Sequence, residues 1–136
     1  MIVADTSVIV KTVVHENLSA TARRLRDQGI AAPAIWIAEA GNALWRKQQV
    51  NAISTAEAAT LFELLLVAPI RTLPIETSAQ DALDIAAALE YPIYDCFFLA
   101  AAIREDTYVV TDDARFAAAV RRHGTWTSRL RLLAEL

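Results

Sequence analysis

The chain has 136 residues, a formal net charge of −3 and a hydrophobic fraction of 55%. These values predict one globular domain, residues 1–136, with a sizeable core, and they argue against a protein that wraps nucleic acid non-specifically. The single cysteine, Cys96, excludes an internal disulfide and fits the reducing cytoplasm. No apolar run reaches the ~18 residues that a membrane helix needs, so we expect no membrane association.

The apolar patterns predict strands that alternate with helices. Residues 2–4 form a β-branched and apolar run, typical of a buried strand that ends at Asp5. The other expected strands are a small one at 30–32 and two more at 70–75 and 107–110. The expected helices are helical turns at 8–14, a helix at 19–27, a long helix at 34–50, helices at 54–67 and 77–89, a buried helix at 96–104 and a helix at 114–123, followed by a packed tail of undecided structure at 125–136. Ser19 or Asn17 is expected to cap the helix at 19–27, which Gly29 ends, and Ser54 to cap the helix at 54–67, with Leu61, Leu64 and Leu65 in the core. This order favours an α/β fold with a parallel sheet between two layers of helices.

Four acidic residues stand in positions where acids are uncommon. Asp5 and Asp113 follow buried strands, Glu39 lies in an apolar stretch of the long helix, and Asp95 starts the most apolar helix. Acids are almost never buried unless they are paired or bind a metal ion. Because the carboxyl ends of parallel strands meet at one edge of a sheet, we expect these carboxylates to converge there. For Asp5, the first segment taken alone favours the role of a helix N-cap over that of a ligand.

A cluster made only of carboxylates favours a hard cation, most simply Mg²⁺, with Mn²⁺ as a substitute. The sequence has no Cys and His cluster for zinc, no glycine-rich phosphate loop and no nucleophile elbow. Such a site mostly serves phosphoryl chemistry, in which the metal ion activates a water molecule. Several basic clusters, Arg46-Lys47 among them, are either solvated helix faces or contacts to a nucleic-acid backbone.

Four segments in order, with these separations, resemble PIN-domain ribonucleases and, among them, the VapC toxins of bacterial toxin–antitoxin pairs. The segments are Val-Ala-Asp-Thr-Ser at 3–7, Glu-Ala-Gly-Asn at 39–42, Tyr-Asp-Cys-Phe-Phe-Leu-Ala at 94–100 and Val-Val-Thr-Asp-Asp-Ala-Arg-Phe at 109–116. The resemblance implies an α/β/α sandwich with a central parallel sheet, RNA cleavage with Mg²⁺ or Mn²⁺, a homodimer, and a cognate VapB-like antitoxin that inhibits it.

The same resemblance implies that Asp5, Glu39, Asp95 and Asp113 are the catalytic and metal-binding residues. Asp113 is favoured over Asp112 because the family pattern is Thr, any residue, Asp, and Thr111 sets that register. The second interpretation is a catalytically silent binding module that keeps the fold and only pairs with an antitoxin or another partner. A third, an Mg²⁺ phosphatase, is disfavoured because that chemistry commonly needs Asp-x-Asp after the first strand, and position 7 is Ser.

Overall fold

The computed structural model describes residues 1–136 as a five-stranded sheet, seven α-helices and three short 3-10 helices. The strands are β1 (Ile2–Ala4), β2 (Ile30–Pro33), β3 (Ile70–Leu73), β4 (Val109–Thr111) and β5 (Leu130–Leu132). The α-helices are α1 (Thr6–Lys11), α2 (Ser19–Arg24), α3 (Ile35–Gln49), α4 (Thr55–Leu66), α5 (Ala79–Leu89), α6 (Ile93–Arg104) and α7 (Ala114–His123), and the 3-10 helices span Leu25–Gln28, Thr127–Arg129 and Leu133–Glu135.

The sheet has the strand order β3-β2-β1-β4-β5, and every neighbouring pair is parallel. β1 lies at the centre, where Val3 is in register with Ala31 on one side and Val109 on the other. A central parallel strand is covered on both faces, which explains why β1 is wholly apolar and buried. All five strands therefore end at the same edge, where the first predicted acid, Asp5, follows β1.

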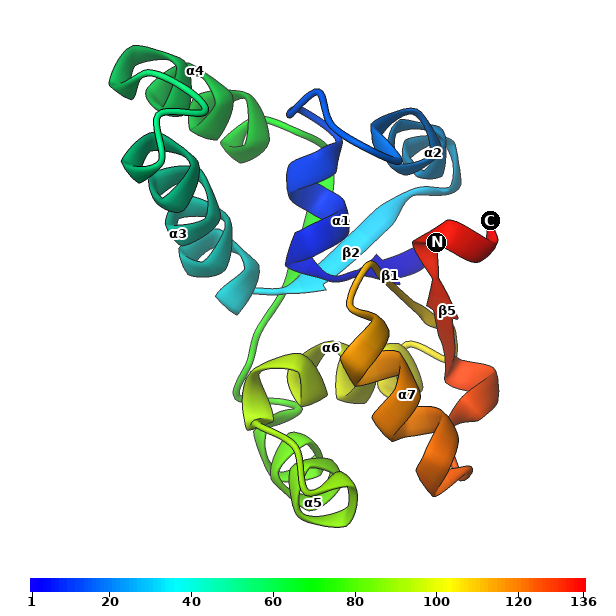
Figure 1. Cartoon of the computed structure of the whole chain (residues 1–136). Helices are drawn as coiled ribbons and strands as arrows, with labels where there is room; N and C mark the ends of the chain where they lie inside the picture. The colour runs from blue at the N-terminus through cyan, green and yellow to red at the C-terminus, as the bar shows by residue number, and fades with distance from the viewer.

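Helices cover both faces of the sheet and make it the middle layer of an α/β/α sandwich, as predicted. Figure 1 shows α1 to α4 on one side and α5 to α7 on the other, and the second view confirms this division. The helical hairpin of α3 and α4 extends away from the sheet in both figures. α6 packs directly below β1 and β2, and its buried alanines, Ala100 to Ala102, allow a close approach. The burial of α6 holds its first turn, with Asp95, under the strand ends.

Several expected elements differ in their bounds or roles. Residues 30–32 were expected to be a minor strand, but β2 is fully buried beside β1. The undecided tail contains β5, a fifth parallel strand at the edge of the sheet. The buried helix begins at Ile93 instead of at Cys96, and Asp95 lies in its first turn, as expected.

Two further expectations, on α2 and α4, are wrong in detail. The N-cap of α2 is Leu18, with a φ of 65°, whereas Ser19 uses its hydroxyl to accept from the backbone of Glu16 at 2.9 Å and to donate to Val14 at 2.7 Å. Leu64 of α4 is exposed, because the buried stripe of that helix passes through Ala58 and Leu65.

No single helix is both long and apolar enough to cross a membrane; α5 and α6 would meet that test only as a pair, and they are bent by 118°.

Candidate active site

A cavity of about 340 Å³ opens at the carboxyl edge of the sheet, and all four predicted acids line it. Asp5 follows β1, Glu39 lies in the second turn of α3, Asp95 in the first turn of α6, and Asp113 precedes α7. The convergence expected from the sequence is therefore present, with one acid from each of four separate segments. The parallel sheet produces it, because each segment leaves or meets the same edge.

Asp5 is a buried N-cap whose two carboxylate oxygens both accept hydrogen bonds. Oδ1 accepts from the backbone of Ser7 at 2.7 Å, from the Ser7 hydroxyl and from the backbone of Val8 at 3.4 Å, and Oδ2 accepts from the Thr111 hydroxyl. Burial raises the pKa of Asp5 above its ordinary value, although these hydrogen bonds oppose the shift. The cap role is thus real, and it fixes the carboxylate at the wall of the cavity.

Glu39 is linked to the start of α1. The Thr6 hydroxyl donates a hydrogen bond of 2.9 Å to Oε1 of Glu39, so α1 and α3 are joined through a side-chain contact at the cavity. Burial raises the pKa of Glu39, the hydrogen bond from Thr6 lowers it, and the charge of Asp5 raises it further. The second oxygen, Oε2, has no protein donor among the hydrogen bonds of Glu39 and is available to a ligand.

Asp95 carries the most perturbed carboxyl group of the four. Burial, followed by the charges of Asp5, Asp113 and Glu39, raises its pKa from 3.8 to about 7, and no hydrogen bond offsets this change. Three other carboxylates are therefore close enough to repel its negative charge. No basic side chain offsets this repulsion at Asp95, and a bound cation would do so.

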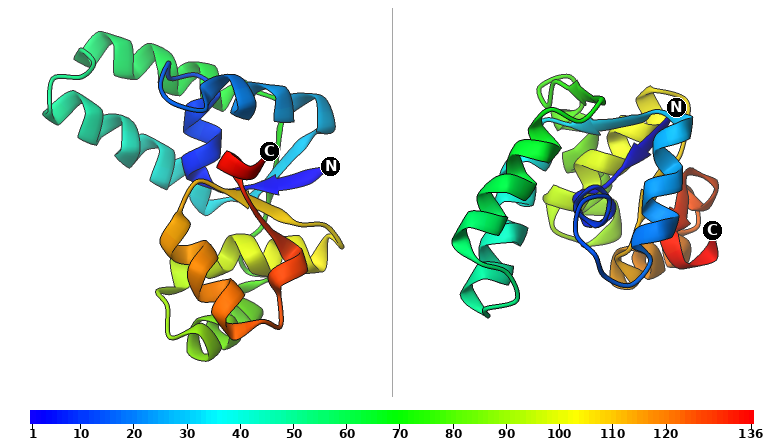
Figure 2. Two further views of the ribbon diagram at one scale, coloured as in Figure 1. Left: turned by 45° about the vertical axis from the view of Figure 1, so that its right-hand side comes forward. Right: turned by 90° about the horizontal axis from the view of Figure 1, so that it is seen from above.

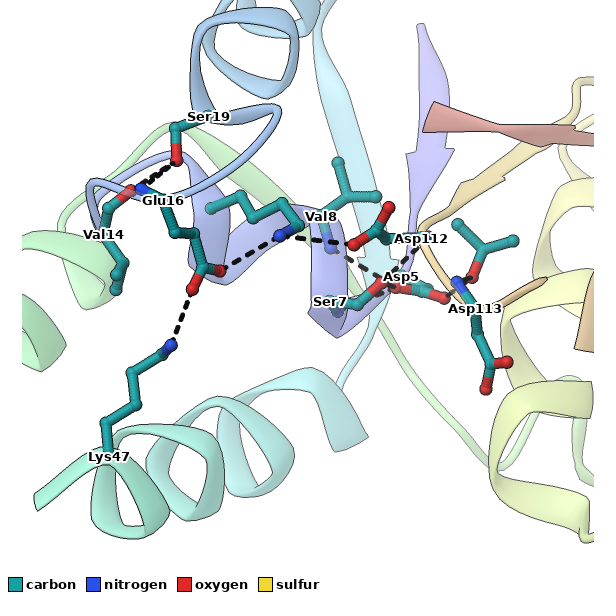
Figure 3. Close-up of polar contacts among 11 residues, drawn as sticks. Asp5, Ser7, Val8, Val14, Glu16, Ser19, Lys47, Asp112 and Asp113 are labelled. Carbon is teal, nitrogen blue, oxygen red and sulfur yellow. Dashed lines mark hydrogen bonds and ion pairs between the residues drawn. The ribbon is translucent and has the colours of Figure 1, made fainter. Parts of the chain in front are cut away.

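Asp112 and Asp113 are neighbours with different partners, and Figure 3 shows their side chains pointing in different directions. Asp113 caps α7, with Oδ1 accepting from the backbone of Arg115 at 2.8 Å and of Phe116 at 3.1 Å. Its Oδ2 faces the hydroxyl of Tyr91 at 3.5 Å. Asp112 instead forms an ion pair with Lys11 at 3.2 Å.

The sequence analysis missed a line of ion pairs along the same cavity (Figure 3). Lys47 contacts Glu16 at 2.7 Å, Glu16 contacts Lys11 at 3.2 Å, and Lys11 contacts Asp112 at 3.2 Å. The two lysines lower the pKa of Glu16 by hydrogen bonds and charge, which outweigh the opposing effect of its burial. Only Lys11 and Glu16 are near in sequence, so no local spacing could have indicated the whole line. It ties α1 to α3 and to the segment after β4.

The donor set at the acidic end of the cavity fits a hard divalent cation, because it consists of carboxylate oxygens that repel one another. No group of three or more His, Cys, Asp or Glu side chains lies close enough together to hold one ion by itself. Mg²⁺ usually keeps several waters and binds through one or two carboxylates. This open arrangement therefore suits Mg²⁺ better than it suits an ion that protein ligands must enclose completely. Asp95 and Glu39 each offer oxygens without a protein donor for this purpose.

Comparisons with known proteins gave one family match and several similar structures. The family model described as a PIN domain matches residues 2–121. No curated protein matches the sequence.

The similar structures include three microbial proteins with low sequence identity. PAE2754 from Pyrobaculum aerophilum has a TM-score of 0.71 at 18% identity, over 98% of this chain and 89% of that chain. VapC20 from Mycobacterium tuberculosis, described as a sarcin-ricin loop cleaving toxin, has a TM-score of 0.68 at 17% identity, over 88% of this chain and 95% of that chain. VapBC2 from Rickettsia felis, solved with a DNA fragment from its promoter, has a TM-score of 0.64 at 15% identity, over 97% of this chain and 98% of that chain. At these identities the likeness establishes a shared fold.

Proposed function

Since this chain belongs to the PIN domain family, we propose that it is a metal-dependent endoribonuclease that hydrolyses RNA phosphodiester bonds at the carboxylate cavity. The observation that carries the proposal is the convergence of Asp5, Glu39, Asp95 and Asp113, from four distant segments, on one cavity. Four acids in one place repel one another and lower the stability of the fold, and the raised pKa of Asp95 is the sign of that cost. Their presence in spite of this cost supports a function for the cluster.

In this proposal Asp5, Asp95 and Asp113 bind Mg²⁺ or Mn²⁺, one or two of them directly and the rest through water, and Glu39 completes the site directly or through water. When bound, the ion would lower the pKa of the water nucleophile and offset the negative charge on the leaving oxygen. The protein's own contribution is orientation. Backbone N–H groups of α1 and α7 and the hydroxyls of Thr6 and Thr111 hold the carboxylates of Asp5, Glu39 and Asp113 in place, as outer partners do at metal sites generally.

We further propose that the chain is a single PIN domain, acts in the cytoplasm as a homodimer, and is the toxin of a VapBC-like pair with a VapB-like antitoxin as its partner. The support is the structural similarity to VapC20 and to VapBC2, together with the four sequence segments that resemble VapC toxins. Co-expression with the gene product of a neighbouring reading frame, followed by co-purification and loss of RNA cleavage, tests the pairing.

The decisive experiment for the activity is cleavage of total cellular RNA by purified protein with Mg²⁺, with Mn²⁺ and with EDTA. Asp95→Asn is the informative variant, because no hydrogen bond holds Asp95 and the substitution keeps the shape of the side chain. The matched control is Asp81→Asn, which changes an exposed acid in the first turn of the neighbouring helix α5, outside the cavity.

We expect discrete fragments with either metal ion, none with EDTA, and none with Asp95→Asn, while Asp81→Asn cleaves like the wild type. Cleavage that survives in Asp95→Asn and remains sensitive to EDTA would refute the site assignment. A folded wild type that cleaves no RNA under any condition would refute the nuclease and favour the catalytically silent binding module.

A further inference from the structure

Arg46 is the one cation of the cavity that has no acidic partner. Three basic side chains line the cavity, and two of them, Lys11 and Lys47, are neutralised by the line of ion pairs through Glu16 and Asp112. Arg46 forms no ion pair, and its side chain is exposed at the same cavity. It therefore contributes a free positive charge near four carboxylates that would otherwise repel a phosphate.

The guanidinium is oriented by a neighbour on the same helix. With its amide oxygen turned toward Arg46, Asn42 accepts from Nε at 3.3 Å and from Nη2 at 3.0 Å. A guanidinium has five N–H donors, so three remain for a ligand after these two are used. A fixed fork of donors of this kind binds phosphate oxygens in pairs, which a mobile lysine does not.

The spacing along α3 separates this group from the acids. Glu39, Asn42 and Arg46 all line the cavity, and they follow one another at helical spacing on one face. Arg46 lies seven residues after Glu39, which corresponds to roughly 10 Å along the helix axis. Although the Arg46 side chain reaches back to Asn42, its backbone lies about two helical turns from Glu39, so the two side chains are placed to serve neighbouring phosphates of one strand.

We propose that Arg46, oriented by Asn42, binds the phosphate of the RNA backbone that neighbours the scissile phosphate and so sets the position of the strand in the cavity. This inference rests on the proposed function, because it takes the acidic end of the cavity as the place of cleavage. Arg46 acts as a binding residue for a phosphodiester and takes no part in the chemical step. The charge of one flanking phosphate replaces the acidic partner that Arg46 lacks in the protein.

The test compares Arg46→Ala and Arg46→Glu with Arg122→Ala and Arg122→Glu. Arg122 is also exposed and without an ion pair, but it lies in the last turn of α7, far from the capped end at Asp113. The paired variants change the net charge equally, so general electrostatic attraction to RNA cancels. Arg46→Lys is included because it keeps the charge and loses the fork. Thermal unfolding confirms that each variant is folded.

Two readouts are needed. The first is steady-state cleavage of an RNA that the wild type cuts, where we expect KM to rise about tenfold for Arg46→Ala with kcat nearly unchanged, since a remote contact binds ground and transition states equally. The second is binding of a fluorescent single-stranded oligouridylate in Ca²⁺, where the slope of log affinity against log salt should fall by about 0.7, the value of one lost phosphate contact. Arg46→Lys should lie between the wild type and Arg46→Ala.

Equal KM and equal oligouridylate affinity for Arg46→Glu and Arg122→Glu would overturn the inference while leaving the nuclease intact. A loss of kcat at unchanged KM would also overturn it, because Arg46 would then act on the reacting phosphate. If no RNA is cleaved by the wild type but only the Arg46 variants lose oligouridylate affinity and salt slope, the nuclease fails and the phosphate contact stands.

Discussion

The hydroxyl of Thr111, the last residue of β4, donates a hydrogen bond to Oδ2 of Asp5, the residue that follows β1. Thr111 is completely buried, and its Oγ1 also accepts from the backbone of Asp113 at 3.0 Å. One hydroxyl therefore fixes the relative positions of two of the proposed metal ligands. A valine has the same shape but can neither donate nor accept.

We expect Thr111→Val to reduce RNA cleavage or Mg²⁺ affinity about 10- to 100-fold, the range typical of partners behind metal ligands. It should also cost about 1–3 kcal/mol of unfolding free energy, because a buried carboxylate oxygen loses its donor. Metal-dependent cleavage and urea unfolding measure the two effects. Thr111→Ser, which keeps the hydroxyl, is the control; if serine is no better than valine, the hydrogen bond has no role.

The pKa of Asp95 makes the stability of the metal-free protein depend on pH. Because the pKa is raised from 3.8 to about 7 in the native state, the native protein keeps a proton that the unfolded chain has already released. Unfolding free energy should therefore fall as the pH rises through the interval from about 4 to about 7. After allowance for solvent screening, we expect the free energy of unfolding to fall by about 1–2 kcal/mol.

Urea unfolding in EDTA at about pH 5 and about pH 8 measures this dependence. Asp95→Asn cannot ionise, so it should show a smaller decrease and should be more stable than the wild type at the higher pH. Identical pH profiles for the two proteins would contradict the electrostatic interpretation of the cavity.

Asp113→Asn and Asp112→Asn separate the two candidate ligands after β4. Asparagine is as good an N-cap as aspartate, so Asp113→Asn keeps the start of α7 and removes only the charge. We expect this variant to melt within a few degrees of the wild type and to lose nearly all cleavage. Asp112→Asn should retain cleavage within a few-fold, since Asp112 is occupied by Lys11. The reverse pattern would make Asp112 the ligand.

Lys11 should matter more for stability than Lys47, although both contact Glu16. The Lys11 side chain is 11% exposed and lies between two carboxylates, whereas that of Lys47 is 27% exposed and has one. Removing the shared cation of a largely buried set leaves uncompensated charges, so Lys11→Met should cost about 2 kcal/mol and Lys47→Met under about 1. Equal costs in urea unfolding would show that the ion pairs contribute little.

The convergence of the acids could be predicted from the sequence because the positions of Asp5 and Asp113 follow directly from the predicted fold. Asp5 and Asp113 each follow a β-branched apolar strand, and parallel strands must end together, so their convergence needed no side-chain detail. Glu39 and Asp95 required the resemblance to a family as well, because a position in a helix does not by itself indicate a direction. The sandwich architecture followed from the alternation of strands and helices.

The missed features depend on contacts between distant residues. β5 has only Leu130 fully buried and is three residues long, so its sequence carries no strand periodicity. In the sequence Lys11 looks like an ordinary cation at the end of a helix, because its partner Asp112 lies near the other end of the sequence. The special position of Arg46 was equally hidden, because the pairing of the adjacent Lys47 with Glu16 is what leaves Arg46 as the free charge.

The strand order β3-β2-β1-β4-β5 places the first strand of the chain at the centre and brings β4 to its side only after more than a hundred residues. Asp5 is therefore synthesised long before Asp113, and no nascent chain that ends before the segment after β4 contains all four acids. Non-local parallel pairing of this kind forms slowly compared with local helices. The carboxylate cavity is therefore completed only when β4 pairs with β1, so the proposed metal site is absent from the chain for most of its synthesis.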